Sequence, residues 1–284
     1  MRSALADGLL LLTAALLFST GGAAIKATQL TGWQVACFRS GAGALALLAM
    51  SREARRGWCK HLIPVGLAYA TTLVLFVLAN KLTTAANAIF LQDAAPLYLV
   101  VLGPWLLGEP ARRSELVLLG VVAVGIGLFF AAREAPLETA PDPFRGNVLA
   151  LVSGFTWALT IAGLRWLGSR RPGSAATAPV VGNALAFAAC LPLALPVNAL
   201  EWKDAAVILY LGVFQIALAY LCMTRALQRV RALEASLLLL VEPALNPVWA
   251  WLAHGERPAP LALAGGALIL GACLAHAVRR AGRT

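Results

Sequence analysis

The sequence predicts an all-α integral membrane protein in which ten transmembrane helices form two inverted five-helix repeats. Three observations lead to this fold class: the composition, the number of long apolar segments, and a segment that recurs at constant spacing. Of the 284 residues, 60% are hydrophobic and only 13% are charged, whereas a soluble domain carries about 25% charged residues. A water-soluble fold of this length could not bury so much apolar surface, so we expect lipid to solvate much of it.

The apolar segments are the elements of this fold. A helix needs roughly 17–25 residues to cross the hydrocarbon core, and ten segments reach that length. The first shows no small-residue cleavage signature and is followed by further apolar segments, so we interpret it as a retained span. The ten expected spans are 4–25, 32–51, 61–80, 84–107, 114–132, 145–167, 175–196, 204–223, 232–253 and 259–278.

The basic residues predict the orientation of these spans. A net charge of +10 would suggest nucleic acid for a soluble protein, but here the basic residues lie in short clusters between apolar segments. If the N-terminus is cytoplasmic, 16 Lys and Arg face the cytoplasm and 6 face the other side, with Arg39 inside a span. Cytoplasmic loops carry the excess of basic residues. We therefore expect a multi-pass protein of the cell's inner (cytoplasmic) membrane with both termini cytoplasmic, whose partners are the lipid bilayer and a small-molecule substrate, not nucleic acid.

A repeated segment relates the two halves of the chain. The stretch "ANKLTTAANAIFLQDAAP" (79–96) aligns with "ALQRVRALEASLLLLVEP" (226–243) at an offset of 147, which pairs Pro96 with Pro243. The same offset pairs Gly108-Glu109 with Gly255-Glu256. We expect one five-helix repeat in residues 1–133, a connecting extracytoplasmic loop in 134–144 and a second repeat in 145–284. Because five is odd, the second repeat crosses the membrane in the opposite sense, which is typical of secondary transporters.

These landmarks carry a family resemblance. The segments "AAPLYLVVLGPWLLGEP" and "LLLLVEPALNPVWAWLAHGE", followed by "GGALILGACL", resemble the drug/metabolite transporter superfamily, specifically its ten-helix EamA-type exporters. Within the superfamily the chain is most similar to the YddG-like amino-acid exporters. It departs from many relatives at "LFST" (17–20), where they carry a Trp before the Ser. The resemblance implies export as the direction of transport.

Two carboxylates and two prolines mark the expected substrate site. Asp93 and Glu242 lie about ten residues inside their spans, which is roughly 15 Å at the rise of an α-helix, and each is close to a proline, Pro96 or Pro243. A carboxylate inside a membrane is costly and normally faces the protein interior or water. A proline also removes a helical hydrogen bond and frees polar backbone. We expect a midplane cavity here; the alternative is a structural pair between Asp93 and Arg39.

The remaining candidate residues are polar or aromatic side chains at comparable depth. A pocket for a zwitterion with an apolar side chain needs a few polar groups among aromatic neighbours. Trp157 lies far from either end of its span, so an interfacial belt explains it poorly, whereas a belt remains the alternative for Trp249. The hydroxyls could instead bond their own preceding carbonyls. The further candidates are Phe18, Ser19, Thr20, Tyr69, Phe76, Asn80, Phe90, Thr160, Phe187 and Asn246.

The sequence argues against catalysis. It contains no HExxH, GxSxG or P-loop motif, and its three histidines lie at span ends. We therefore expect neither an enzyme nor a cofactor; an intramembrane lipid-modifying enzyme or a scaffold is a weaker alternative. The expected function is secondary transport by alternating access, exporting small metabolites and most of all neutral or aromatic amino acids. Efflux of lipophilic or cationic drugs is the alternative, and the sequence leaves the oligomeric state, monomer or homodimer, open.

Overall fold

The computed structural model describes residues 2–106, 113–132, 135–171, 173–197, 200–232, 235 and 238–281. Within these residues the chain is helical apart from short connections and one isolated β-bridge between Leu137 and Ala140. The prediction of an all-α protein is confirmed there. In lipid a helix satisfies its own backbone groups, which explains why apolar segments of this length adopt no other regular structure.

The helices follow the expected segments in order. The first half contains α1 (Arg2–Ser19), α2 (Gly21–Lys26), α3 (Gly32–Met50), α4 (Leu62–Leu82), α5 (Ala85–Gln92), α6 (Ala95–Leu106) and α7 (Arg113–Ala131). The second half contains α8 (Pro143–Arg170), α9 (Ser174–Ala194), α10 (Trp202–Tyr210), the π-helix η1 (Leu211–Leu218), α11 (Ala219–Leu227), α13 (Val241–His254) and α14 (Pro260–Ala281).

Several of these helices are long and apolar enough to cross a membrane. Among the described residues, six helical runs meet that standard: Ala6–Lys26, Leu62–Leu82, Ala85–Leu106, Pro143–Arg170, Ser174–Ala194 and Trp202–Leu227. Gly120–Ala131 and Pro260–Ala272 are shorter apolar helices. The chain is therefore a multi-pass membrane protein, while the number of ten crossings stays a prediction.

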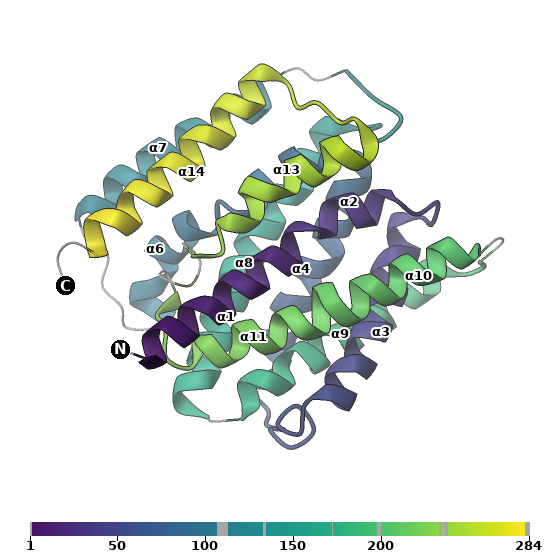
Figure 1. Ribbon diagram of the computed structural model, residues 1–284, viewed down its shortest axis with the longest axis vertical. Coiled ribbons are helices and arrows are strands. Elements are labelled where there is room, and N and C mark those ends of the chain that lie inside the picture. Colours follow the sequence, from purple (N-terminus) through teal and green to yellow (C-terminus); the bar gives the residue numbers. More distant parts are fainter. Residues whose placement is uncertain are drawn as a thin grey trace.

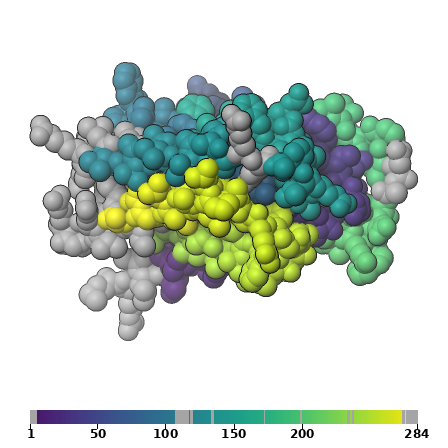
Figure 2. Space-filling view, turned by 90° about the horizontal axis from the view of Figure 1, so that it is seen from above, coloured from purple at the N-terminus to yellow at the C-terminus, as the bar shows by residue number. Residues whose placement is uncertain are grey.

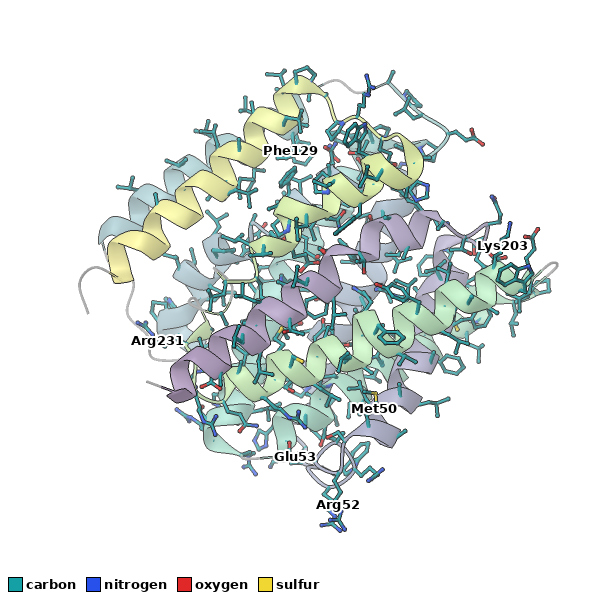
Figure 3. The ribbon with its side chains drawn as sticks, viewed as in Figure 1. Met50, Arg52, Glu53, Phe129, Lys203 and Arg231 are labelled. Carbon is teal, nitrogen blue, oxygen red and sulfur yellow. The ribbon has the colours of Figure 1, made fainter. Side chains whose placement is uncertain are left out.

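The two helices α1 and α14, which hold the ends of the chain, point their terminal residues toward the same end of the bundle (Figure 1). The labelled charged side chains also avoid the middle of the molecule: Lys203 lies at one end, and Arg52, Glu53 and Arg231 lie toward the other (Figure 3). Such a distribution suits a protein whose middle is solvated by lipid.

Packing brings the two halves together along the whole bundle. In the interior, α3 packs on α9, α4 packs on α8 and α9, and α1 packs on α11 and α13. At the periphery, α14 lies alongside α7 (Figures 1 and 2). Each of these contacts joins residues of the first half to residues of the second half.

Small residues allow the closest of these contacts. A Cβ placed on Gly265 would lie 2.6 Å from the carbonyl oxygen of Gly125, and one on Gly125 would lie 2.9 Å from the carbonyl oxygen of Gly265. Phe129 is buried beside this crossing (Figure 3). Helices in membranes commonly approach through such residues because no side-chain layer separates their backbones.

Two helical runs are interrupted at positions related by the sequence repeat. The first run breaks at Asp93–Ala94, between α5 and α6, and Pro96 lies in the first turn of α6. The second breaks at Leu239–Leu240, and Glu242 and Pro243 lie in the first turn of α13. A proline is tolerated in a first turn, where its missing N–H would have no helical partner anyway. The prolines thus begin new helices after a break instead of kinking continuous ones.

Candidate functional site

A small cavity lies at the centre of the bundle. Its volume is about 30 Å³, far below the roughly 300–1,000 Å³ of a typical small-molecule site. Helices from both halves of the chain contribute side chains to it. The lining residues are Phe18, Arg39, Thr72, Leu73, Phe76, Gln92, Trp157, Gln215, Tyr220 and Glu242.

Aromatic rings form one wall of this cavity. Phe18 of α1 lies edge-on to Tyr220 of α11 and to Trp157 of α8, with ring centroids 5.0 Å and 6.3 Å apart. Trp157 and Tyr220 are themselves edge-on at 6.2 Å. Tyr69 of α4 extends the cluster behind Tyr220, at 4.6 Å. Edge-to-face geometry at such distances is favourable for aromatic pairs, so this aromatic cluster (Phe18, Tyr69, Trp157 and Tyr220) is a packed, shaped surface.

Arg39 of α3 brings a positive charge to the cavity. Its side chain is completely buried. It donates from Nη2 to the carbonyl oxygen of Leu73 at 3.1 Å and from Nη1 to Oε1 of Gln215 at 3.5 Å, while Nε has no partner. The structure holds no ion pair between Arg39 and Asp93 within its described residues. The expected alternative of a structural lock between these two residues therefore gains no support.

Two carboxylates lie where the interrupted helices of the two halves pack together. Asp93 follows α5, Glu242 lies in the first turn of α13, and α5 contacts α13. Both side chains are buried. Oδ2 of Asp93 has no hydrogen-bond partner. The N-termini of α6 and α13, which carry partial positive charge, are the local groups that favour the two carboxylates.

A chain of hydroxyl and amide groups borders the cavity on the side of α8. Gln92 donates to Ser153 Oγ at 2.8 Å, and Ser153 donates to the carbonyl oxygen of Thr72 at 3.2 Å. Thr72 Oγ1 in turn donates to Thr156 Oγ1 at 2.9 Å. This network joins α4, α5 and α8, and buried polar groups linked in this way hold one another in fixed positions.

The structure brings four of the predicted site residues to the cavity: Phe18, Phe76, Trp157 and Glu242. Tyr69 lies directly behind it, where Nδ2 of Asn183 donates to its hydroxyl at 2.8 Å. Thr160 and Asn80 are buried nearby in α8 and α4. Asp93, Pro96 and Pro243 are buried at the helix interruptions that adjoin it.

The other predicted residues lie away from the cavity. Phe90 packs against Phe129 and reaches Gly266 of α14. Phe187 packs against Gly41 between α9 and α3. Asn246 is buried next to Gly22.

Trp249, Ser19 and Thr20 form a separate lateral group. Trp249 is 37% exposed and donates to Ser19 Oγ at 3.0 Å. Thr20 shares a hydrogen bond of 2.8 Å with the hydroxyl of Tyr210. Thr20, Tyr210 and Trp249 all border a shallow groove on the side of the bundle.

A buried ion pair closes one end of the bundle, here called the Lys26 end. Lys26 Nζ lies 2.8 Å from Oε1 of Glu256, and both side chains are only 3% exposed. Lys26 also donates to the carbonyl oxygens of Thr83 and Thr139. Oε2 of Glu256 accepts the backbone N–H of Ala85 at 2.9 Å. The ion pair therefore joins the end of α2, the start of α5 and the link between α13 and α14.

Some residues at the cavity were missed by the sequence reasoning. Thr72, Leu73 and Gln92 were not candidates, and Gln215 and Tyr220 were weaker candidates than the residues named in the sequence analysis. A signal existed for Gln92, which is a polar residue directly before Asp93 in an otherwise apolar segment. No comparable signal distinguishes Thr72 from its neighbour Thr71, whose side chain is directed to the carbonyl of Leu67.

A buried polar cavity at the centre of an all-helical, lipid-solvated bundle with interrupted helices is the architecture of a membrane transport protein. The profile of the EamA-like transporter family matches the chain twice, over residues 7–131 and 144–276. The chain belongs to the EamA-like transporter family.

Individual relatives agree with this family. The chain is 26% identical over 277 residues to the pseudopaline exporter CntI of two Pseudomonas aeruginosa strains, with 94% of each chain covered. A protein of known crystal structure shares the fold with a TM-score of 0.69 and 20% identity, over 96% of this chain and 98% of the other.

Proposed function

We propose that this protein is a secondary transporter that exports small metabolites, most of all neutral or aromatic amino acids, by alternating access. The observation that carries the proposal is the central cavity, because side chains from both halves of an EamA-family chain line it. The similarity to the pseudopaline exporters supports export of a small molecule. The YddG-like subtype and the inner membrane are parts of the same proposal.

The helix contacts support a division into two equivalent five-helix units, 1–133 and 145–284, linked by residues 134–144. If the two units are equivalent, the contact between α4 and α8 should have a counterpart between α11 and α1, and that between α4 and α9 one between η1 and α3. Both counterparts are present. The remaining pairs, α3 with α9 and α7 with α14, are their own counterparts. A twofold relation of this kind is what an inverted repeat requires.

The small volume of the cavity supports alternating access. At about 30 Å³ it has no room for an amino acid, and the Lys26 end is sealed by a buried ion pair. A substrate can therefore enter only after helices of the two units move apart. Rocking of one unit against the other around a central site is the usual way in which inverted repeats achieve this.

Efflux of lipophilic cations is the second candidate function. Asp93 and Glu242 favour it, because two buried carboxylates without a basic partner within the described residues would attract a cation. Arg39 at the same cavity opposes it. Flux measurements with purified protein in lipid vesicles separate the two functions: accumulation of labelled amino acids but not of cationic dyes supports amino-acid export, and the reverse supports the alternative. A screen of metabolites released by overexpressing cells identifies the physiological compound.

The proposed topology predicts the labelling of a cysteine in the 134–144 connection. Glu138 is exposed, and it lies at the Lys26 end because its neighbour Thr139 accepts a hydrogen bond from Lys26. Glu53 is exposed toward the opposite end (Figure 3). In intact cells we expect an impermeant thiol reagent to label Glu138→Cys but not Glu53→Cys. The unaltered protein is the control, because Cys37, Cys190 and Cys222 are buried and Cys59 is half-buried. Labelling of only Glu53→Cys would invert the topology.

The aromatic wall of the cavity predicts that Trp157 determines the preference of the transporter for substrates with large side chains. Replacing Trp157 with alanine is expected to weaken transport of phenylalanine by about tenfold or more, because it removes a large aromatic contact surface. Transport of alanine, which is too small to fill the space, should change much less. Trp105→Ala is the matched control, since Trp105 is 89% exposed. Equal losses for both amino acids would show that Trp157 is a packing residue.

A further inference from the structure

The central cavity is lined by one basic and one acidic side chain that do not pair with one another. Arg39 of α3 and Glu242 of α13 both line it and both are buried. Neither forms an ion pair with any side chain in the part of the chain that the structure describes. A buried charge without a counter-charge is costly, so each is expected to have a partner at some stage of the working cycle.

The guanidinium of Arg39 has unused hydrogen-bonding capacity. An arginine side chain offers five N–H donors, whereas the structure gives Arg39 two hydrogen bonds, to Leu73 and Gln215. Its buried Nε has no partner. The planar arrangement of these donors matches the two oxygens of a carboxylate, which accept them in parallel.

Gln215 holds Arg39 in place from an unusual backbone segment. It belongs to the π-helix η1, and segments of this kind occur frequently at functional sites. Its Oε1 accepts from Arg39, and its Nε2 is so close to α2 that a Cβ on Gly21 would lie 2.9 Å from it. The amide is therefore confined between two helices, with its oxygen directed to the guanidinium.

Three rings of the aromatic cluster, Phe18, Trp157 and Tyr220, line the same cavity as Arg39 and Glu242. Tyr220 lines the cavity together with both Arg39 and Glu242, and it packs against Phe18 and Trp157. The cavity thus combines a basic side chain, an acidic side chain and an aromatic surface. A molecule with one carboxylate, one ammonium group and an apolar side chain is complementary to this arrangement.

We propose that Arg39 and Glu242 form a two-point site for a zwitterion, in which Arg39, oriented by Gln215, binds the substrate carboxylate and Glu242 binds its ammonium group. The proposal rests on the proposed export of amino acids and names the groups that select them. A simple organic cation would leave Arg39 unpaired, and a simple organic anion would leave Glu242 unpaired. The site therefore discriminates against both, since a buried polar group without its partner weakens binding strongly.

A series of four compounds tests the site on the unaltered protein. The probes are L-phenylalanine, its amide (no carboxylate), 3-phenylpropanoate (no ammonium group) and phenethylamine (no carboxylate). The measurement is the ligand-dependent rise in melting temperature of protein in lipid nanodiscs, titrated to an apparent affinity. We expect the three analogues to bind at least about tenfold more weakly than phenylalanine, which is the effect of losing one charge-assisted hydrogen-bonded contact.

Variants of Arg39 and Glu242 test which residue binds the carboxylate of the substrate and which binds its ammonium group. Arg39→Gln should weaken phenylalanine binding at least about tenfold and leave binding of the amide within about twofold of the unaltered protein. Glu242→Gln should also weaken phenylalanine binding at least about tenfold, and it should leave the binding of 3-phenylpropanoate unchanged. Lys203→Gln is the matched control, because Lys203 is exposed at the Lys26 end (Figure 3). If Arg39→Gln does not fold, Arg39→Lys, which keeps the charge but lacks the planar fork, should lose part of the preference for the acid.

The outcomes distinguish failure of the two-point site from failure of the proposed amino-acid export. If the amide binds the unaltered protein as tightly as phenylalanine, or Arg39→Gln keeps the preference for the acid, the two-point site is wrong. Flux of labelled phenylalanine in vesicles would then still support amino-acid export. If phenylalanine neither binds nor crosses the membrane while a cationic dye does, the proposed export function fails, and the site fails with it.

Discussion

Replacing Lys26 with methionine is expected to lower the free energy of unfolding by about 3–5 kcal/mol. The variant would leave the carboxylate of Glu256 without its cation in a place where both side chains are only 3% exposed. It would also remove the donor to the carbonyl oxygens of Thr83 and Thr139. The measurement is the denaturant dependence of unfolding, or the melting temperature, of the purified protein in mild detergent.

Two further variants separate charge from packing at this position. The double change Lys26→Met with Glu256→Gln should recover most of the lost stability, because a neutral pair of similar volume avoids the unpaired charge. Lys203→Met is the matched control. Because this lysine is exposed, its replacement should change the free energy of unfolding by no more than about 0.5 kcal/mol. A double variant as unstable as Lys26→Met would instead assign the loss to the packed stem of Lys26.

The same contact bears on transport. The Lys26 end joins α2 and the start of α5 to the link after α13, so it ties the first half of the chain to the second half. Opening a path to the cavity from this end must break the ion pair. We therefore expect the double variant to keep its stability and to expose this end more often, which faster reaction of a thiol introduced at Ala85 would reveal.

Replacing Glu242 with glutamine is expected to reduce substrate flux by at least about tenfold while leaving the melting temperature nearly unchanged. Glu242 and Asp93 are both buried, at the ends of two helices, α13 and α5, that contact one another. Buried carboxylates on two contacting helices repel one another when both are ionised, so binding or release of a proton by either of them would couple transport to a proton gradient. The neutral amide has a similar shape and avoids the repulsion, and the fold should therefore tolerate it.

Flux in vesicles with and without an imposed pH gradient provides the test. The unaltered protein should respond to the gradient, whereas Glu242→Gln and Asp93→Asn should not. Glu138→Gln is the control, because that carboxylate is exposed outside the helices. Loss of folded protein in Glu242→Gln, instead of loss of flux, would show that the carboxylate pair has a structural role.

The sequence by itself determined the features that depend on composition and order along the chain. The low charge and the long apolar segments determined that lipid solvates the protein, and the helices of the structure follow the expected segments in order. The pairing of Asp93–Pro96 with Glu242–Pro243 predicted two special positions, and the helical runs are interrupted close to both. These features are local, since a proline and an isolated carboxylate act on the helix that contains them.

Only the tertiary structure decided which side chains meet. In a membrane helix the face toward lipid is as apolar as the face toward protein, so the sequence pattern does not reveal which side is buried. This is why Phe90 and Phe18 looked equivalent, although Phe90 packs on Phe129 and Phe18 lines the cavity. It is also why Tyr220 and Gln215 ranked low and why Arg39 was considered only as a partner of Asp93. Their positions depend on how α3, η1 and α11 pack across the two halves, and that packing arises from contacts between residues more than 170 positions apart, such as Arg39 with Gln215.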